Sequence, residues 1–275
     1  MGTRTLELKI NQYKRIITFG CSWTKYDWPT WANVISEILD LPLVNQGTAG
    51  IGNVAILHKM LAWDIEHGFD DTDLVLVNWS TWSREDRIKN GGWKTGGNIF
   101  NSKFYNAGFI REYWDDENDF VKNAGAIIMA GRLFNIAYQS RMPYENTTAK
   151  FHHKNWLSNL SHIEDFANDN YQNQEWRNLT SDVHPSILPH TYHAIKIAKL
   201  FGFKDTDKLD KVKEAYEQLH DNIFNDLLKI GPKKISKDKN RTIVPRAVKL
   251  NLKKLSRPVD FQCHTGKETW HGLYD

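Results

Sequence analysis

The chain has 275 residues, of which 40% are hydrophobic and 25% charged, and its formal net charge is +3. These values are typical of a globular protein with one large or two small domains, and no apolar stretch is long enough to span a bilayer. The N-terminus lacks a signal peptide's apolar core and cleavage site. The two cysteines, Cys21 and Cys263, indicate a reducing compartment rather than a disulfide framework. We therefore expect a cytoplasmic protein with no membrane partner.

The first 80 residues alternate between predicted strands and helices. Short apolar runs are typical of buried strands, and apolar residues at helical spacing indicate amphipathic helices. Thr30 is a suitable N-cap for the first helix. The expected elements are, in chain order, a strand at 14–20, a helix at 31–40, a strand at 41–44, a helix at 53–67 and a strand at 73–79. This alternation predicts an α/β fold with a parallel sheet and right-handed crossovers.

The pattern is less regular after residue 83. A segment rich in Gly, Asn and Trp predicts a long inserted loop over 89–118. Helices are expected at 119–140 (with a strand within 126–129 as the alternative), 151–168, 187–202 and 207–230. No fourth or fifth strand has a distinct signature. We assign 1–230 to one αβ domain with an insertion at about 85–175, and 231–275 to an extended C-terminal tail.

The C-terminal tail is strongly basic. Residues 232–257 hold ten Lys and Arg against one acidic residue, so this segment carries +9 and the rest of the chain −6. Such a strip can contact nucleic acid, a membrane surface or an anionic glycan. Because no nucleic-acid-binding motif accompanies it, we interpret it as a solvated extension, with nucleic acid not expected as a partner. The alternative is a homo-oligomer in which the tail wraps a neighbouring subunit.

Tryptophan is unusually frequent, at 11 of 275 residues. Several tryptophans follow the first and third expected strands, in loops that would border the same edge of the sheet. Flat aromatic faces suit sugar rings, bases or acyl groups. The alternative is that each of them packs in the core, and for any single tryptophan this alternative is favoured.

A candidate nucleophile follows the first strand. The apolar run Ile16–Phe19 stops at Gly20, and Cys21 and Ser22 follow at once. Glycine relaxes the steric limits on a sharp turn, and α/β proteins bind ligands at such strand-to-helix connections. An N-capped structural turn is the alternative. A thiol is intrinsically the stronger nucleophile, so Cys21 competes with Ser22.

Two later segments complete a possible acyl-transfer site. Three glycines within 47–52 mark a loop whose backbone turns sharply or approaches a ligand closely. Asp182 and His184 are separated by one residue, and Pro185 biases His184 toward an extended conformation. A serine, a glycine-rich loop and an Asp–His pair could serve as nucleophile, oxyanion donor and base.

The order of these segments resembles the SGNH (GDSL-like) hydrolase family. Phe19–Trp23 is similar to its first block, Asn45–Gly50 to its second, and Asp182–Pro185 to its fifth. The resemblance implies a three-layer αβα sandwich with a parallel, flavodoxin-like sheet. It also implies Ser22 as nucleophile, Asp182 and His184 as its partners, and an oxyanion hole formed by Gly50 and the backbone N–H of Ser22.

The chain departs from the family pattern at three points. Cys21 stands where the family has Asp, and only Val183 separates Asp182 from His184, where the family usually has two residues. In the third block, Trp82 aligns best with the expected Asn, since Asn78 comes too early. The side chain that could replace this oxyanion donor is Asn53 or, with weaker support, Ser80 or Thr81. The substrate contacts are assigned to Trp23, Trp82 and Arg84. Gly-Cys-Ser, a Trp-Ser turn followed by Arg, and His-Pro-Ser are similar to phage-like members of the family.

These observations predict a serine esterase or deacetylase acting on a polar ester, such as an O-acetylated glycan. An acyltransferase with the same triad and a binding module that has lost the chemistry are the alternatives. No cofactor is expected. A metal site formed by His184, His190 and His193 is a weaker interpretation, because no Cys or carboxylate completes a known ligand pattern; a helix with partly exposed histidines is preferred.

Overall fold

The computed structural model describes residues 10–89, 92–101, 105–142, 152–153, 155, 160, 163–166, 175–176, 179 and 184–230. These residues divide into two compact units. The sheet unit is built from Tyr13–Lys25 and Val44–Phe166, and the helical unit from Tyr26–Leu43 and the described residues between 175 and 230, with 10–12. Each unit is described by itself. The basic tail at 231–275, with Cys263, lies outside the described residues, so the proposed domain boundary at 230 stays a prediction.

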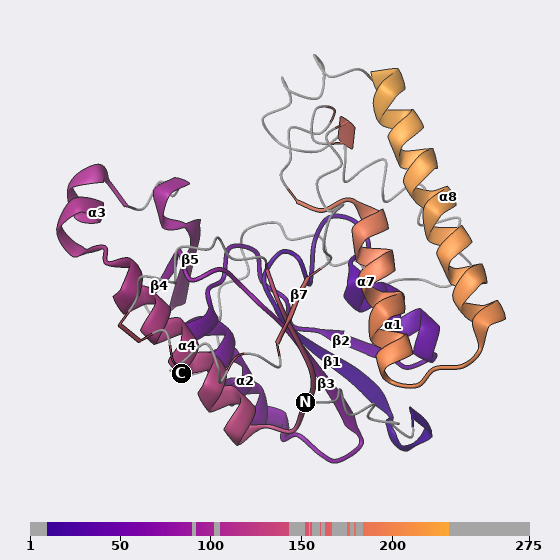
Figure 1. The fold of residues 1–275 in the computed structure, drawn as a ribbon, viewed down its shortest axis with the longest axis horizontal. Coiled ribbons are helices and arrows are strands. Elements are labelled where there is room, and N and C mark those ends of the chain that lie inside the picture. The colour runs from indigo at the N-terminus through magenta and orange to yellow at the C-terminus, as the bar shows by residue number, and fades with distance from the viewer. Residues whose placement is uncertain are drawn as a thin grey trace. The chain divides into compact units, whose positions relative to one another are not determined.

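The main sheet has the strand order β2-β1-β3-β6-β7 (Figure 1). Its strands are β1 (Arg15–Gly20), β2 (Leu43–Asn45), β3 (Asp73–Trp79), β6 (Ile136–Arg141) and β7 (Glu164–Asp165). The pairs β1–β3, β3–β6 and β6–β7 are parallel. In sequence order this is the 2-1-3-4-5 arrangement of flavodoxin-like folds. The predicted α/β class and the parallel sheet are confirmed.

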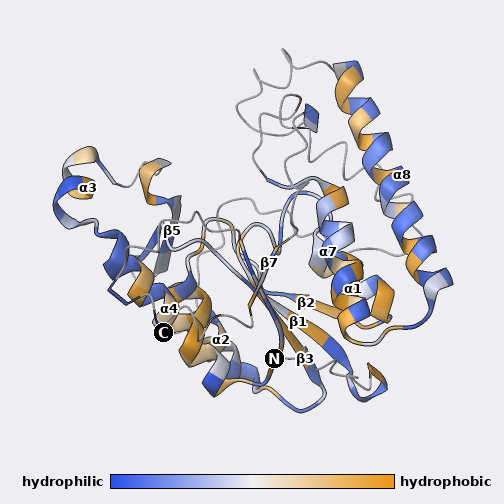
Figure 2. Ribbon diagram, viewed as in Figure 1, coloured by the Kyte–Doolittle hydropathy of each residue, from blue (hydrophilic) through white to orange (hydrophobic). Residues whose placement is uncertain are grey.

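The apolar runs read from the sequence form the centre of this sheet. Every residue of β3 is buried, as are the last five residues of β1, and Figure 2 shows hydrophobic residues along both strands. At the start of the β1–β3 register, Arg15 Nε donates to Asp73 Oδ1 at 2.6 Å. Burial on both faces is what near-continuous apolar strands in parallel sheets require.

Two helices accompany the sheet within the same unit. α2 (Asn53–His67) packs against β1 and against α4 (Asp116–Leu133), and the two helices lie side by side in Figure 1. α2 buries Ile56 and Met60, and α4 buries Phe120 and Ile127. The helix expected at 53–67 is confirmed with these bounds. Its packed face differs from the apolar spacing that indicated it, Val54, Leu57, Leu61 and Ile65, because only Leu57 of these is buried and Ile65 is 74% exposed.

The helical unit contains α1 (Trp31–Leu39), α7 (Ile187–Leu200) and α8 (Thr206–Ile230). α7 packs against both α1 and α8. The Trp31 ring meets the His193 ring edge-on, and Tyr216 donates to Glu37 at 3.0 Å. The expected N-cap is confirmed at Thr30, whose backbone N–H bonds the side chain of Asn33.

Three secondary-structure predictions after residue 83 were wrong. The expected loop at 89–118 contains the end of β4 (Arg84–Lys89), β5 (Gly92–Asn98), a short 3₁₀ helix at Ile99–Asn101 and α3 (Ala107–Tyr113). β4 and β5 pair as an antiparallel hairpin, so charged and glycine-rich segments gain strand structure by pairing rather than by burying one face.

The single helix expected at 119–140 ends at Leu133, and β6 follows after two residues. The run from Ile136 continues the apolar helical spacing but pairs with β3 instead. The helix expected at 151–168 is contradicted at Glu164–Asp165, which pair with β6 as β7. In both places tertiary pairing overrides the local pattern.

Burial tests two further expectations. For five of the loop tryptophans the favoured core alternative is confirmed over an aromatic rim: Trp28, Trp31 and Trp79 are at most 1% exposed, and Trp23 and Trp82 at most 9%. Trp93 and Trp114 are half-buried. His190 and His193, expected to be partly exposed, are buried in α7. Within the described parts of the chain, no helix has both the length and the apolar character needed to cross a membrane.

Candidate active site at the carboxyl ends of β1 and β3

The chain reverses its direction of winding at β1. β1 has β2 on one side and β3 on the other, so the carboxyl ends of β1 and β3 form a topological switch point, where open α/β sheets bind ligands. Gly20 ends β1 and is followed by Cys21 and Ser22; Trp79 ends β3 and is followed by Ser80. The candidate site is built from these two strand ends.

The turn after β1 is too tight for any residue but glycine at its first position. Gly20 has φ +153°, and a Cβ there would lie 2.2 Å from Thr24 Oγ1 and 2.6 Å from the carbonyl oxygen of Asn78. The turn closes with the N–H groups of Thr24 and Lys25 both bonded to the Cys21 carbonyl. Ser22, 3% exposed, is thereby held in the turn directly after the strand.

Cys21 is directed toward β6. Its Sγ is 3.6 Å from Met142 Sδ, directly after the end of that strand, and the residue is fully buried. This contact fits a supporting role for Cys21 and leaves Ser22 as the candidate nucleophile, an assignment that stays a prediction.

The glycine-rich loop is joined to the Ser22 turn through Asn45. Its Nδ2 donates to the Thr24 carbonyl at 2.8 Å, and its Oδ1 accepts from the Gly47 N–H at 3.0 Å. The fit is close, because a Cβ on Gly47 would lie 2.7 Å from Lys25 Cβ. The structure thus brings the first and second sequence motifs together, and Asn45 is a residue whose bridging role the sequence did not disclose.

The loop continues along the end of β1. The Gln46 N–H donates to the carbonyl oxygen of Thr18 at 2.8 Å, and the Thr48 N–H donates to the carbonyl oxygen of Gly20 at 2.9 Å. Gly50, the candidate oxyanion donor, has φ +75°, a left-handed conformation that favours glycine. Its role in the oxyanion hole stays a prediction.

Asn53 connects this loop to the end of β3. Its Oδ1 accepts from the Ser80 N–H at 2.7 Å and its Nδ2 donates to the Ser80 carbonyl at 3.0 Å, and both residues are fully buried. One hydrogen of Nδ2 is used in this way. If Asn53 donates to the oxyanion, it must therefore use the second hydrogen of Nδ2. Thr81 Oγ1 lies 3.2 Å from Ser83 Oγ.

The remaining sequence-assigned residues have different surroundings. Asn78 lies within β3, as expected, and donates to Ser140 Oγ at 2.8 Å. The Trp82 ring meets Phe120 edge-on, and the Trp23 ring meets Phe166 edge-on. Both indoles are buried, so neither presents an exposed aromatic face. Their assignment to substrate binding stays a prediction.

Arg84 extends from β4 to the same strand ends. Its Nη1 donates to the Ile51 carbonyl at 2.9 Å, and its Nη2 lies 3.7 Å from Met142 Sδ. Nε is buried and has no hydrogen-bond partner among the described residues. Arg84 therefore joins the glycine-rich loop to the residue that follows β6, and its assignment to substrate binding stays a prediction.

His184 belongs to the helical unit. Its ring stacks on Tyr26, with centroids 4.0 Å apart, and the next residue, Pro185, accepts from Trp28 Nε1 at 2.9 Å. Asp182 lies outside the described residues. The pairing of Asp182 and His184 with Ser22 accordingly stays a prediction.

The histidines of α7 are buried rather than exposed on the helix. Burial lowers the pKa of His190 well below its usual value and that of His193 to about 3. In the described part of the chain no group of three His, Cys, Asp or Glu side chains is arranged to hold a metal ion.

No family model and no curated protein match the chain. A lipolytic protein of the G-D-S-L family from Desulfitobacterium hafniense DCB-2 is 13% identical, over 68% of this chain and 99% of that protein, with a TM-score of 0.39. A member of the lipolytic G-D-S-L family from Veillonella parvula DSM 2008 is 16% identical, over 68% of this chain and 98% of that protein, with a TM-score of 0.38. These similarities are too low to define an activity, so the function is argued from the site itself.

Proposed function

We propose that the protein is a serine hydrolase that cleaves a polar ester through Ser22, His184 and Asp182. The observation that carries the proposal is the linkage of three backbone segments at the switch point of the sheet. Asn45 bonds the Ser22 turn and the glycine-rich loop, and Asn53 bonds the segment after β3. A serine in a tight turn beside a glycine-rich loop is an arrangement that acyl transfer uses.

In the first step, Ser22 Oγ attacks the ester carbonyl and His184 takes the hydroxyl proton. The resulting oxyanion is stabilised by the backbone N–H groups of Ser22 and Gly50, together with the second N–H of the Asn53 amide. Asp182 holds the imidazole tautomer and stabilises its charged form. The C–O bond of the ester then breaks, and the alcohol leaves with the proton held by His184.

In the second step, water hydrolyses the acyl-enzyme. His184 takes a proton from the water as it attacks the acyl carbonyl, and the same backbone donors stabilise the second oxyanion. The bond to Ser22 breaks, the serine regains its proton from His184, and the carboxylic acid leaves.

The substrate class that we propose is a short polar ester, of which an O-acetylated glycan is one example. Because Trp23 and Trp82 are buried, these two residues do not support the glycan part of this proposal.

The test is intact mass after incubation with a fluorophosphonate, on the wild type and on Ser22→Ala. A single adduct on the wild type that Ser22→Ala lacks is expected, because the reagent reports an activated serine. A folded wild-type protein without an adduct contradicts the proposal. An adduct that persists in Ser22→Ala contradicts the assignment of the nucleophile.

A further inference from the structure

The β4–β5 hairpin is docked on the glycine-rich loop. The Gly97 N–H donates to the Gly50 carbonyl at 3.1 Å, and Thr95 Oγ1 donates to the Ala49 carbonyl at 3.2 Å. A Cβ on Gly50 would lie 2.9 Å from the Thr95 carbonyl oxygen. The segment that the sequence presented as an inserted loop is therefore in direct contact with the candidate oxyanion donor.

Two side chains of β4 bind opposite ends of a single peptide group. Arg84 Nη1 donates to the Ile51 carbonyl at 2.9 Å, and Asp86 Oδ2 accepts from the Gly52 N–H at 2.8 Å. These two backbone groups belong to the same planar peptide unit. With the carbonyl of Gly50 bonded to Gly97, the backbone next to the Gly50 N–H is held from three points of the hairpin.

Asp86 also supplies the N-cap that α2 lacks. The N-cap residue is Gly52, which has no side chain, and its N–H donates to Asp86 Oδ2 at 2.8 Å. Burial raises the pKa of the Asp86 carboxyl to about 7, and hydrogen bonds from the N–H groups of Gly52 and Ala55 oppose that rise. A capping carboxylate next to the helix start normally comes from the N-cap residue itself. Here a Cβ on Gly52 would lie 2.6 Å from Asp86 Oδ2, so the glycine makes room for a cap from another strand.

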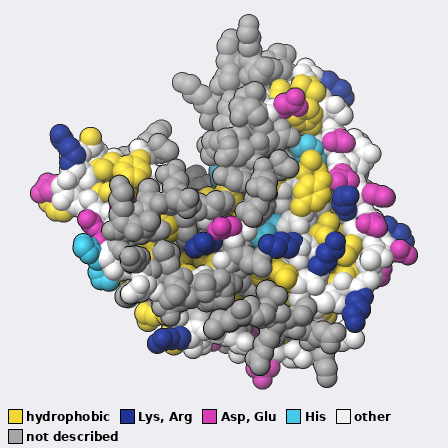
Figure 3. Space-filling view, in the orientation of Figure 1, with side chains coloured by type: hydrophobic (Ala, Val, Ile, Leu, Met, Phe, Trp, Pro, Cys, Tyr) yellow, Lys and Arg dark blue, Asp and Glu magenta, His cyan; other side chains and the backbone are white. Residues whose placement is uncertain are grey.

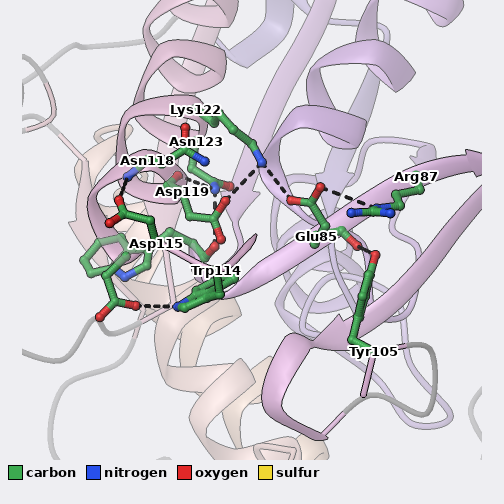
Figure 4. A network of polar contacts seen from close by, with 11 residues as sticks. Glu85, Arg87, Tyr105, Trp114, Asp115, Asn118, Asp119, Lys122 and Asn123 are labelled. Atoms are coloured by element: carbon green, nitrogen blue, oxygen red, sulfur yellow. Dashed lines mark hydrogen bonds and ion pairs between the residues drawn. The ribbon is translucent and has the colours of Figure 1, made fainter. Parts of the chain in front are cut away.

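Glu85 of β4 is held by different residues, Lys122 of α4 and Tyr105, which precedes α3. Lys122 donates to Glu85 Oε2 at 2.7 Å and to Asp119 Oδ1 at 3.0 Å, and Tyr105 donates to the Glu85 carbonyl at 2.9 Å (Figure 4). Glu85 and Asp86 are neighbours on one strand, yet one bonds α4 and the other the glycine-rich loop. Glu85 is therefore a matched control for Asp86.

We propose that Arg84 and Asp86 are positioning residues that fix the Ile51–Gly52 peptide and thereby the direction of the Gly50 N–H. This inference rests on the proposed hydrolase function. A donor that is fixed before the reaction stabilises the oxyanion without reorganisation, whereas a loop free to rotate must first be ordered. A displacement of about 1 Å can cost about 100-fold in rate.

The test compares Asp86→Ala, Asp86→Asn and Glu85→Gln by fluorophosphonate labelling, by ester kinetics and by hydrogen exchange of the 46–56 segment. For Asp86→Ala we expect kcat and the labelling rate to fall about 10- to 100-fold, because the oxyanion exists only in the transition state. KM should change by less than about threefold, on the same argument. Exchange of the 46–56 segment should become faster.

Asp86→Asn keeps an acceptor for the Gly52 N–H and should regain most of the lost rate. It also carries the test if Asp86→Ala does not fold, since a kcat about two- to tenfold below that of the wild type, with faster exchange of the 46–56 segment, is then expected. Glu85→Gln should stay within about twofold of the wild type in rate and exchange, because it does not contact the loop.

Three results overturn the inference. Wild-type labelling rate and exchange in both Asp86 variants would show that the loop does not depend on this contact. Equal losses in Glu85→Gln and the Asp86 variants would show that only the stability of the hairpin matters. A folded wild type that is not labelled would overturn the hydrolase function and, with it, this inference, whereas the first two results leave the hydrolase function intact.

Discussion

Asn53 pairs with both backbone groups of Ser80. The amide at the start of α2 accepts the Ser80 N–H at 2.7 Å and donates to the Ser80 carbonyl at 3.0 Å, entirely inside the protein. A backbone segment that has left the β3 ladder needs such partners, because a buried polar group without a hydrogen bond costs free energy. Asn53 therefore holds the start of α2 and the end of β3 together.

Asn53→Ala should lower the free energy of unfolding by about 2–4 kcal/mol, because two buried backbone groups of Ser80 lose their partners. Urea denaturation measures the loss. Asn222→Ala is the control, since Asn222 accepts from Gln218 on an exposed face of α8, and its effect should stay within about 0.5 kcal/mol. A loss below about 0.5 kcal/mol in Asn53→Ala would mean that water replaces the amide.

Ser22→Ala should lower esterase activity by at least about 1000-fold, because removing a nucleophile disables the whole triad. Cys21→Ala should keep activity within about tenfold, because the Cys21 sulfur contacts Met142 rather than acting on substrate. Hydrolysis of short acetyl esters by both variants checks this. Activity lost in Cys21→Ala and retained in Ser22→Ala would transfer the nucleophile to the thiol.

The sequence could predict the parts of the fold that burial alone determines. β1 and β3 are apolar because they are buried on both faces, and their boundaries were identified to within one residue. β6 has only two buried residues, and β7 is two residues long, so neither has a pattern of its own. Their strand structure depends on pairing with β3 and β6, which no local signal encodes.

The candidate site divides in the same way. Ser22 and Gly50 could be proposed as candidates because a tight turn after a strand and a glycine-rich loop have local signatures. Asn45 and Asp86 could not be found, because their roles depend on which backbone groups the fold brings beside them. For Asp86 the available signal was weak: it lies two residues after Arg84, hence on the same face of a strand, but the segment was not identified as a strand.

The ion pair between Lys122 and Asp119 should matter most at neutral to alkaline pH. Burial raises the pKa of Asp119 to about 6, and its hydrogen bond to Lys122 opposes that rise. Below pH 6 the Asp119 carboxyl of the folded protein is largely protonated, so it no longer forms an ion pair with the Lys122 ammonium group. Lys122→Met should therefore cost about 1–2 kcal/mol at pH 8 and less at pH 5, since Lys122 itself is partly exposed.

Urea denaturation of Lys122→Met at both pH values measures this difference. Lys229→Met is the control, because Lys229 pairs with Asp226 on the exposed side of α8 and should have almost no effect at either pH. An equal cost for Lys122→Met at pH 5 and pH 8 would mean that the ion pair with Asp119 contributes nothing, and that the bond to Glu85 or the methylene groups of Lys122 stabilise the hairpin against α4.

Figure 3 shows exposed hydrophobic side chains over α3, and Phe100 and Tyr113 are more than half exposed. Arg87 covers part of this surface, with its guanidinium 4.6 Å from the centre of the Phe109 ring. Arg87→Ala should therefore expose more aromatic surface and strengthen binding of a hydrophobic dye such as ANS, with Lys94→Ala on the same hairpin as the control. Unchanged dye binding would contradict the stacking.

Asp86 should make stability fall as pH rises from about 4 to 7. Burial raises its pKa in the folded protein to about 7 from an ordinary value of 3.8. Between these values the folded state holds a proton that the unfolded state has released, so raising the pH favours unfolding. The stability that the protonated Asp86 carboxyl adds to the folded state is fully present below about pH 4 and is lost above pH 7.

Asp86→Asn removes this titration. Relative to the wild type, the variant should gain stability between pH 5 and pH 8, on the order of 1–2 kcal/mol, because the Asp86 residue is partly exposed and solvent screens part of the effect. Urea denaturation across this range measures the gain, with Glu85→Gln as the charge-matched control. A constant difference between Asp86→Asn and the wild type at every pH would mean that Asp86 titrates near its ordinary pKa, so that the N–H groups of α2 compensate fully for its burial.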